Sequence, residues 1–313
     1  QVAALPLDCD KDWIVDGPVV VPTGATLTIK AGTTLRAKKG VLASIIVQPG
    51  GRIVAEGQKT APIVMTVDDP APKAGDWRGL FVLGNAPRTG TGGYAGDALL
   101  TYGGNNPNDD SGVLTYVRVE YAQDSIVLGG VGKGTRIDSL QARFGNDNCF
   151  VLNGGSVDAK HLVCQSPVDE QFEIGDGYTG HLQFIYGQKT GQGDGHNGLL
   201  LDGAATAPVI YNATFCGAAQ TQGVLGIGAV FRNGAKLDLN NTILTGWAAA
   251  IDAINAVNAP SLRSSIAFNN TANPSVEEAA ATDDDNAFDE NAFFRTAESG
   301  NKEADPGLMD CHN

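Results

Sequence analysis

Carboxylate side chains recur at a regular spacing in the middle of the chain. Asp147 is followed 22 residues later by Asp169, and Glu170, Glu173 and Asp176 lie in the same short stretch. Calcium prefers six to eight oxygen ligands, supplied by carboxylates and backbone carbonyls. If the fold brings residues 22 apart together, these five carboxylates form a calcium site. The alternative is a solvated acidic corner without an ion, and no established calcium-loop spacing is present.

A denser acidic run lies near the C-terminal end. Asp283, Asp284 and Asp285 are followed closely by Asp289 and Glu290. Asp283 and Asp285 are the candidate ligands of a second divalent cation here. The favoured alternative is a capping loop whose acidic residues face water or a helix N-terminus.

Polysaccharide cleavage is the catalytic chemistry to consider. A hydrolase needs two carboxylates flanking the bond, which Asp147 and Asp169 could supply. A lyase needs a base and charge neutralisation, which Lys160, His161 and His181 could supply. Their spacing does not distinguish them from surface residues, and the four histidines show no metal-ligand spacing. Since nucleophile-elbow, His-Glu-x-x-His and phosphate-loop motifs are absent from the sequence, we predict no catalytic residues and no required cofactor.

Aromatic residues suggest another kind of binding site. Trp77, Tyr94, Tyr102 and Tyr178 could form a platform on which sugar rings stack. The favoured alternative is that these rings pack over glycine turns.

Five cysteines allow at most two disulfides. Cys149 and Cys164 are 15 residues apart on neighbouring predicted strands, and a bridge between them closes a short loop. The alternative is a pair of buried thiols. Cys9 can reach Cys311 only if the C-terminal tail folds back, because about ten stacked rungs separate the ends by roughly 45 Å.

The elements that must position these residues repeat along the chain. Short runs with apolar residues at i and i+2, closed by glycine, begin at Leu27, Ile53, Leu80, Ile126, Phe150, Phe172, Leu199, Ala229 and Ala249. The interval of 46 between Leu80 and Ile126 is taken as two rungs of 23. A second series begins at Val117, Leu140, Leu162 and Phe184. Alternation interrupted by glycine indicates strands, and two series in phase indicate a solenoid.

Composition agrees with a right-handed parallel β-helix of about ten rungs. Of 313 residues, 42% are hydrophobic, only 7% are aromatic and 41 are glycine. Such a chain has material for a large aliphatic core and many tight turns. We assign residues 1–275 to the β-helix, with an N-terminal cap at residues 13–21. Residues 276–313 form a short acidic C-terminal cap in which Phe288, Phe293 and Phe294 close the core, and inserts at 85–112 and 187–197 interrupt the coil.

Several segments resemble a known family. They include Gly75-Asp76-Trp77-Arg78-Gly79-Leu80, Tyr102-Gly103-Gly104-Asn105 and Tyr116-Val117-Arg118-Val119-Glu120-Tyr121, with Gly177-Tyr178-Thr179-Gly180 further on. Over residues 13–310 the chain resembles secreted or surface-attached bacterial β-helix proteins with a pectate-lyase-like solenoid, found in myxobacteria and Bacteroidetes. The resemblance implies the fold and export, but no reaction. Asn146-Asp147-Asn148 stands where the family pattern has paired aspartates, and lipoproteins of the family begin at a lipidated cysteine.

We predict a non-catalytic extracellular or cell-surface module, with calcium as a possible stabilising ion. The alternatives are a carbohydrate-active enzyme, either a lyase or a hydrolase, and a self-assembling filament subunit. The net charge of −14 disfavours nucleic acid and polyanionic substrates. Expected partners are an extracellular polysaccharide, a surface protein or another copy of the chain. A start at Gln1 suggests that a signal segment has been removed, and no apolar run is long enough to span a membrane.

Overall fold

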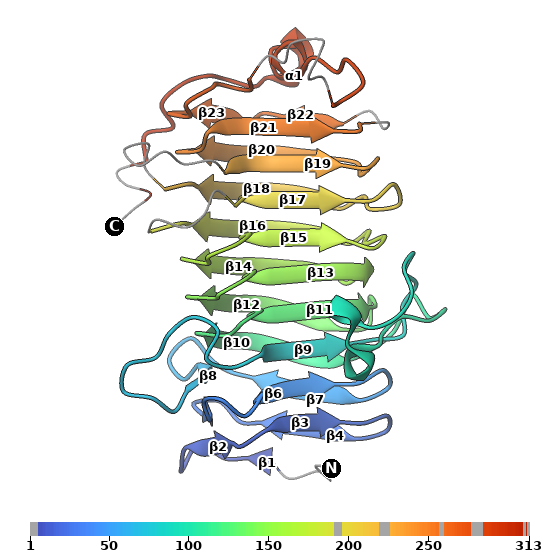
Figure 1. Cartoon of the computed structure of the whole chain (residues 1–313), viewed down its shortest axis with the longest axis vertical. Coiled ribbons are helices and arrows are strands. Elements are labelled where there is room, and N and C mark those ends of the chain that lie inside the picture. Colours follow the sequence, from blue (N-terminus) through green and yellow to red (C-terminus); the bar gives the residue numbers. More distant parts are fainter. Residues whose placement is uncertain are drawn as a thin grey trace.

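The computed structural model describes residues 6–190, 196–218, 226–256, 260–276, 284–308 and residue 311. In this part of the chain, short parallel strands stack turn upon turn into a β-helix (Figure 1). The fold predicted from the alternating apolar runs is therefore confirmed, as is the estimate of about ten rungs. Among the described residues, no helix is long and apolar enough to cross a membrane.

Sheet A has 14 strands in the described part of the chain. They are β1 (Pro6–Leu7), β2 (Trp13–Val15), β4 (Thr26–Ile29), β5 (Thr34–Ala37), β7 (Arg52–Glu56), β8 (Ile63–Val67), β10 (Gly112–Glu120), β12 (Arg136–Arg143), β14 (Ala159–Gln165), β16 (His181–Gln188), β18 (Val209–Cys216), β20 (Asp238–Thr245), β22 (Ser261–Arg263) and β23 (Ile266–Phe268). The long strand β10 pairs with β7 through its first half and with β8 through its second half, so sheet A has two faces joined by a bend.

Sheet B has nine strands in the described part of the chain. They are β3 (Pro18–Val21), β6 (Ser44–Val47), β9 (Gly79–Leu83), β11 (Ile126–Val131), β13 (Phe150–Gly155), β15 (Phe172–Gly175), β17 (Leu199–Asp202), β19 (Ile227–Arg232) and β21 (Ala249–Ile254). Residues 13–15 and 18–21, which belong to the segment assigned as the N-terminal cap of the β-helix, pair as β2 and β3 in the first turn.

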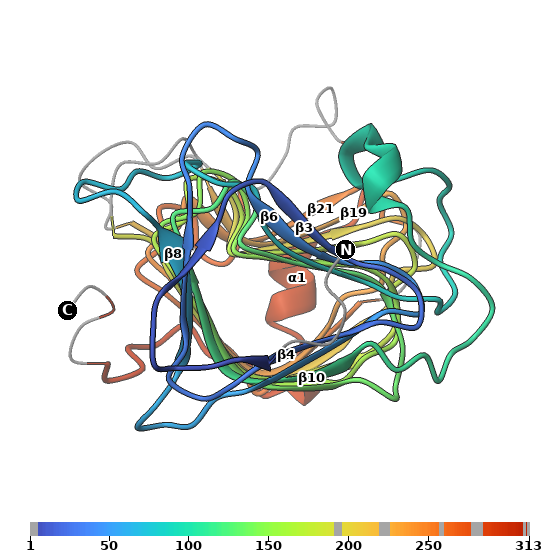
Figure 2. The same ribbon diagram turned by 90° about the horizontal axis from the view of Figure 1, so that it is seen from below.

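Figure 2 shows the coil along its axis. Apolar side chains of both sheets meet inside it. Inward residues of successive strands lie directly over one another. Phe150 is paired with Phe172, for example, and their rings stack 5.0 Å apart. Each rung therefore covers the apolar surface of the rung before it, which is the main source of stability in a solenoid.

Three details of the predicted repeat are wrong. Leu27 and Ile53, placed in one series with Leu80, belong to sheet A, whereas Leu80 belongs to sheet B. Leu80 pairs directly with Ile126, so the interval of 46 residues is one rung carrying an insert and not two rungs. Ile185, rather than Phe184, continues the inward row after Leu162. Phe184 has a φ of 57° and its side chain is exposed, because the strand bends there.

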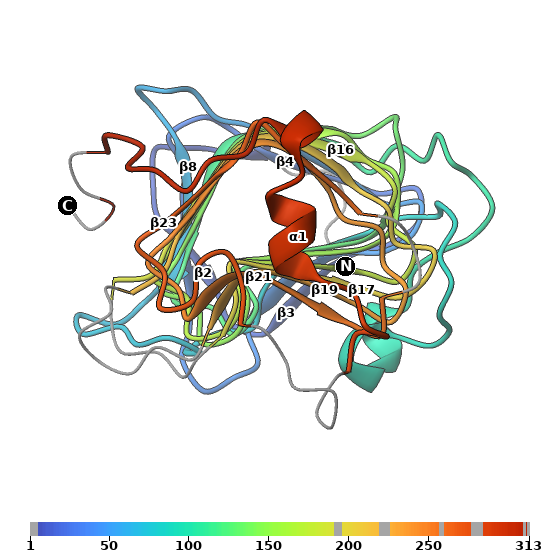
Figure 3. The same cartoon turned by 90° about the horizontal axis from the view of Figure 1, so that it is seen from above.

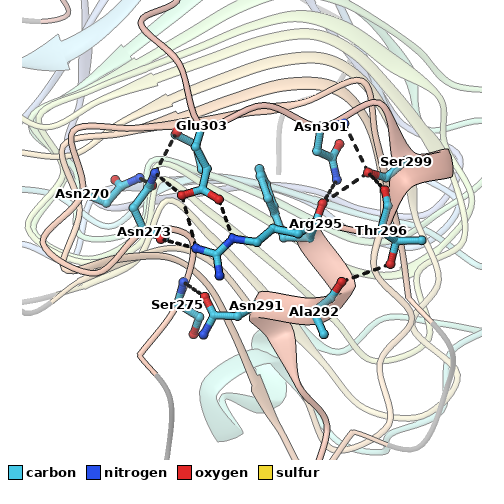
Figure 4. A network of polar contacts seen from close by, with 12 residues as sticks. Asn270, Asn273, Ser275, Asn291, Ala292, Arg295, Thr296, Ser299, Asn301 and Glu303 are labelled. Atoms are coloured by element: carbon cyan, nitrogen blue, oxygen red, sulfur yellow. Dashed lines mark hydrogen bonds and ion pairs between the residues drawn. The ribbon is translucent and has the colours of Figure 1, made fainter.

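The described C-terminal residues pass over the last turn, where helix α1 (Glu290–Phe294) lies across the open end of the coil (Figure 3). Phe294 is buried, and the rings of Phe231 and Phe288 meet edge to face with centroids 6.0 Å apart. A polar network holds this cap (Figure 4). In it, Arg295 donates to Glu303 Oε1 at 2.6 Å and to the Asn273 carbonyl at 3.1 Å.

Three short 3-10 helices complete the described secondary structure. They are η1 (Tyr94–Gly96), η2 (Ala98–Leu100) and η4 (Ala297–Ser299). The first two belong to the insert at 85–112, which protrudes beside β9 and β11 (Figure 1).

Candidate functional site

Turns that lead from sheet A into sheet B stack on one another and align their acidic side chains. The Asp147 amide donates to the Gln123 carbonyl at 2.8 Å, and the Asp169 amide donates to the Asp147 carbonyl at 3.4 Å. Residues one rung apart in sequence are therefore neighbours in space. We call the resulting group the acidic cluster; it comprises Asp124, Asp147, Asp169, Glu170, Glu173 and His196.

Two asparagines hold the glutamates of the acidic cluster. Asn148 accepts a hydrogen bond from the Glu170 amide at 3.1 Å and donates to Glu173 Oε2 at 2.7 Å. Asn197 donates to Glu170 Oε1 at 3.1 Å and accepts from the Ile227 amide at 3.0 Å. Neutral amides thus fix both carboxylates without neutralising them.

Burial and mutual repulsion make the acidic cluster hold protons. Burial, followed by contact with Asp169, raises the pKa of Asp147 to about 6. Burial and a hydrogen bond with Glu170 raise the pKa of Asp169 to about 6. Burial and the charges of the neighbouring aspartates raise the pKa of Glu173 to about 7. A carboxyl group in contact with another carboxyl group is more stable when one of the two is protonated.

Asp124 is a buried member of the acidic cluster. It is 7% exposed, and hydrogen bonds from Tyr94 and Asn148 to its carboxyl group lower its pKa. Its Oδ1 atom has no hydrogen-bond partner among the described residues. Burial, and then the charge of Asp147, raises the pKa of Asp124 to about 6. A buried carboxyl oxygen without a partner is unfavourable unless it meets a proton, an ion or a ligand.

His196 joins the cluster from the turn before β17. Its Nδ1 atom lies 2.6 Å from Asp169 Oδ1 and 4.0 Å from Glu170 Oε1. Ligand atoms of these three residues all lie within 4.8 Å of one another, a spacing that a metal ion could bridge. His196 was not among the residues predicted from the sequence, although its position 27 residues after Asp169, one rung further on, was the available signal.

The insert at 85–112 borders the cluster. Outward residues of sheet B form a row in which Phe81, Val127 and Val151 are apolar and Glu173 comes next. Leu100 and Tyr102 of the insert pack with the apolar members of this row. Leu100 and Tyr102 therefore cover the outer surface of sheet B as far as Val151, and the acidic cluster begins at the next residue of the row, Glu173.

Asp176 anchors the insert and lies apart from the acidic cluster. Its Oδ2 atom lies 2.7 Å from Arg88 Nε and accepts a hydrogen bond from the Tyr102 hydroxyl at 2.9 Å. Its Oδ1 atom accepts from the Thr89 hydroxyl at 3.1 Å and from the Gly90 amide. Both carboxylate oxygens are thus engaged by the protein, which argues against the predicted role of Asp176 as a calcium ligand.

The predicted aromatic platform does not exist as a surface. Trp77 is 3% exposed and donates to the Glu120 carbonyl at 2.8 Å, while Tyr178 is fully buried and donates to the Val157 carbonyl at 2.6 Å. Tyr102 is 6% exposed, beneath Arg88.

Tyr94 packs against Phe81, with ring centroids 6.2 Å apart. Burial and the nearby charges of Asp124 and Glu173 raise the pKa of its hydroxyl, which places Tyr94 beside the acidic cluster. Packing, the favoured alternative for these aromatic residues, accounts for Trp77, Tyr102 and Tyr178.

The remaining candidate residues lie elsewhere. Lys160, His161 and His181 are on sheet A, where His161 Nδ1 is 2.8 Å from Asp138 and His181 Nδ1 is 2.8 Å from Asp158. The structure therefore does not combine them with Asp147 and Asp169. Asp285 is buried in the cap and accepts a hydrogen bond from the Phe288 amide at 2.9 Å. Asp283, the other proposed ligand there, lies outside the described residues.

Two disulfides are present. Cys149 and Cys164 are bonded, as predicted from their spacing, with their Cα atoms 5.7 Å apart. Cys216 is bonded to Cys311, so the C-terminal tail returns along the coil and Cys9 is left as an exposed free thiol. The sequence could not give this pairing because it depends on the path of the tail.

Comparison with known proteins identifies the family. The sequence family described as "Pectate-lyase like beta helix domain" matches residues 2–309. The chain belongs to this family. An alginate lyase from Paenibacillus sp. str. FPU-7 is similar in structure with a TM-score of 0.36 and 14% identity, over 76% of this chain and 81% of that chain. Such a distant likeness supports no inference about activity. No curated protein matches the sequence.

Proposed function

We propose that the protein is an extracellular polysaccharide-active β-helix that hydrolyses a neutral glycan at the acidic cluster. The observation that carries this proposal is a group of touching carboxyl groups with pKa values raised to about 6–7. The cluster is open to solvent at Asp169 and His196, whose side chains are 28% and 41% exposed. Two disulfides support an extracellular location, because disulfides persist in oxidising compartments.

Acid-catalysed hydrolysis needs a proton donor whose pKa lies near the working pH. Asp169 fits this role, because its pKa is raised to about 6 and its side chain reaches the surface. The donor gives its proton to the leaving oxygen of the glycosidic bond, while an ionised carboxylate either activates water or attacks the sugar. Asp147 in the preceding turn and Glu170, the next residue, both contact Asp169, whereas the two carboxyl groups of a glycosidase stand about 5–9.5 Å apart. Asp124 and Glu173, which belong to the acidic cluster without contacting Asp169, are therefore the candidates for the second carboxylate.

The electrostatics favour an uncharged substrate. His196 pairs with Asp169, Arg232 lowers the pKa of Glu173 through its charge, and the whole chain carries a net charge of −14. A polyuronate would be repelled at the point where it must bind. The description of the family as pectate-lyase like is compatible with a polysaccharide substrate, but the choice of a neutral chain comes from the charge.

Divalent-cation binding at the same place is the second candidate. Asp169, Glu170 and His196 bring their ligand atoms within 4.8 Å of one another, and the unpartnered oxygen of Asp124 lies in the same cluster. Calcium prefers oxygen ligands, whereas a histidine nitrogen favours a transition metal. A bound ion would hold the cluster ionised and leave the protein as the binding or structural module that the sequence suggested.

The test is release of reducing ends from a panel of neutral polysaccharides. We expect activity in the wild type with an optimum near pH 6, and a loss of about 10²–10⁴-fold in Asp169→Asn. Asp202→Asn is the matched control. Asp202 is the last residue of β17 in sheet B, and it pairs with Arg232 at 2.9 Å instead of with another carboxyl group. Absence of activity on every glycan, or an unchanged rate in Asp169→Asn, refutes hydrolysis.

Thermal unfolding with Ca²⁺, Mn²⁺ or Zn²⁺, and with a chelator, tests whether the acidic cluster binds a divalent cation. Stabilisation by an ion that disappears in Asp169→Asn supports a cation site, because an ion that binds only the folded state raises the unfolding midpoint. Equal midpoints with ion and with chelator argue against it.

A further inference from the structure

Sheet A bends at the same position in successive turns. In each turn, the residue at the bend has a left-handed backbone with φ between 49° and 57°, and the next residue points into the core. The residues at the bend are Tyr116, Ser139, His161, Phe184, Asn212 and Asn241. The inward residues that follow them pair in one continuous register from β10 to β20. The bend is therefore one structural position that six different residues occupy.

Two of these residues are poor choices for such a backbone. Asparagine and histidine are enriched at a positive φ, which accounts for Asn212, Asn241 and His161. Tyr116 and Phe184 are bulky residues that rarely adopt this conformation. They are also 40% and 47% exposed, so burial does not compensate. Neither the backbone nor the core accounts for aromatic residues here, and strained residues at a surface point to function.

The exposed rings form a row along the coil. His161 and Phe184 stack with ring centroids 5.2 Å apart and planes 8° apart. Tyr211 is 45% exposed on the next rung, where it pairs with Gln183 and so lies one position before the bend. Tyr116 lies at the bend three rungs before Phe184, with Ser139 at the bend between Tyr116 and His161. Four rungs at about 4.8 Å each give the row a length of about 19 Å. We call Tyr116, His161, Phe184 and Tyr211 the aromatic row.

The surface beside the aromatic row is hollow and polar. Two hollows of about 840 and 550 Å³ adjoin there and share Arg136 and Asp138 as lining residues. Gln183 lines one hollow and donates to Asn212 Oδ1 at 3.0 Å. Positive and negative side chains alternate along this face, since Arg136 and Lys160 lie among Asp138 and Asp158. The balance of charge favours neither a polyanion nor a polycation.

We propose that this face of sheet A is a second glycan-binding surface, which holds a neutral polysaccharide chain along the coil axis. Aromatic rings offer apolar surface to the C–H faces of sugars, and amide and charged groups beside them accept and donate hydrogen bonds to hydroxyls. A long, shallow and charge-balanced strip suits an extended neutral chain. The surface is separate from the acidic cluster, and the proposal does not depend on hydrolysis there.

The experiment measures binding of soluble dextran, xylan, mannan and mixed-linkage β-glucan by affinity electrophoresis and titration calorimetry. The protein is the full chain carrying Asp169→Asn, so that cleavage cannot remove the ligand. Phe184→Asn and Tyr116→Asn introduce the residue that other rungs use at the bend. We expect each to weaken binding at least about tenfold, a loss readily measured from the dissociation constant, without lowering the midpoint of thermal unfolding.

Leu42→Asn is the matched control, because Leu42 is 70% exposed and has a φ of 51° but lies away from the aromatic row. Its affinity should equal that of the parent. No binding of any neutral glycan overturns the proposal, as does equal binding by Phe184→Asn. Stronger binding of alginate or pectate than of neutral chains also overturns it. If Phe184→Asn instead abolishes a dimer seen by light scattering and glycans do not bind, the face contacts another copy. Binding of a neutral glycan at this face, together with no hydrolysis of any glycan by the wild type, would refute only the catalytic proposal.

Discussion

At the level of single residues, the carboxylates of the acidic cluster are held by neutral amide groups. Asn148 and Asn197 supply the N–H donors that fix Glu173 and Glu170, so positioning is achieved without neutralisation. The remaining repulsion is relieved by protons, which is why the pKa values of Asp147, Asp169 and Glu173 are raised. The same arrangement that suits proton donation makes the folded protein sensitive to pH.

The first prediction concerns the dependence of stability on pH. The pKa of Glu173 is raised from 4.5 to about 7, so the folded state binds a proton that the unfolded state has released between these values. Its contribution is complete below about pH 4.5 and is lost as the pH rises through about 7. Glu173→Gln should therefore match the wild type at pH 4.5 and unfold about 2–4 °C higher at pH 8, roughly the shift that 1 kcal/mol gives in a large domain.

Differential scanning calorimetry across this range provides the measurement. Glu298→Gln, at an exposed site in the cap, should show no pH-dependent difference from the wild type. A Glu173→Gln variant that is less stable than the wild type at pH 8 would show that the carboxylate is stabilised there by a cation.

At the scale of elements, the insert at 85–112 depends on one carboxylate. Arg88 and Asp176 have side chains only 11% and 14% exposed, and Asp176 also receives Tyr102, Thr89 and the Gly90 amide. Removing one partner of a poorly solvated ion pair costs about 3–5 kcal/mol when burial is complete. The lost stability should be confined to the insert, because this ion pair does not hold the stacked strands beneath it together.

Asp176→Asn should therefore raise hydrogen exchange within residues 85–112 while leaving exchange in β11 and β13 unchanged. Asp202→Asn tests the alternative that any lost ion pair has this effect, because Asp202 and Arg232 are 36% and 40% exposed and such a pair contributes little. Exchange that rises equally throughout the coil in Asp176→Asn would show that the insert is part of the global folding unit.

The sequence predicts where the strands lie better than it predicts which sheet they join. Alternating apolar residues located the strands, because a buried face must repeat every second residue. Alternation does not say which sheet a strand joins, so Leu27 and Ile53 of sheet A were placed in one series with Leu80 of sheet B. The left-handed residue at the bend shifts the alternation by one, which misplaced Phe184. The rung spacing was sufficient to bring Asp147 near Asp169, but an insert docking through Asp176 leaves no periodic signal.

At the scale of the whole molecule, a stack of parallel strands must end somewhere. The last strands leave backbone groups that another chain could pair with, and proteins cover or interrupt such edges. Here α1 lies across the end, with Phe294 buried and Phe288 in contact with both Phe231 and Phe293. Arg295 and Glu303 hold the following segment in place. The cap thus combines an apolar plug, formed by Phe288, Phe293 and Phe294, with the ion pair between Arg295 and Glu303.

Removing the plug should make the coil both less stable and prone to association. Phe294→Ala deletes a buried ring, and such changes cost about 3–5 kcal/mol. We expect a lower midpoint of thermal unfolding, together with dimers or larger species in light scattering at temperatures where the coil is still folded by circular dichroism. Leu308→Ala, at a residue that is 43% exposed, should change neither property. If Phe294→Ala lowers the midpoint but remains monomeric, the cap stabilises the last turn without shielding its edge, and end-to-end pairing is then not what the cap prevents.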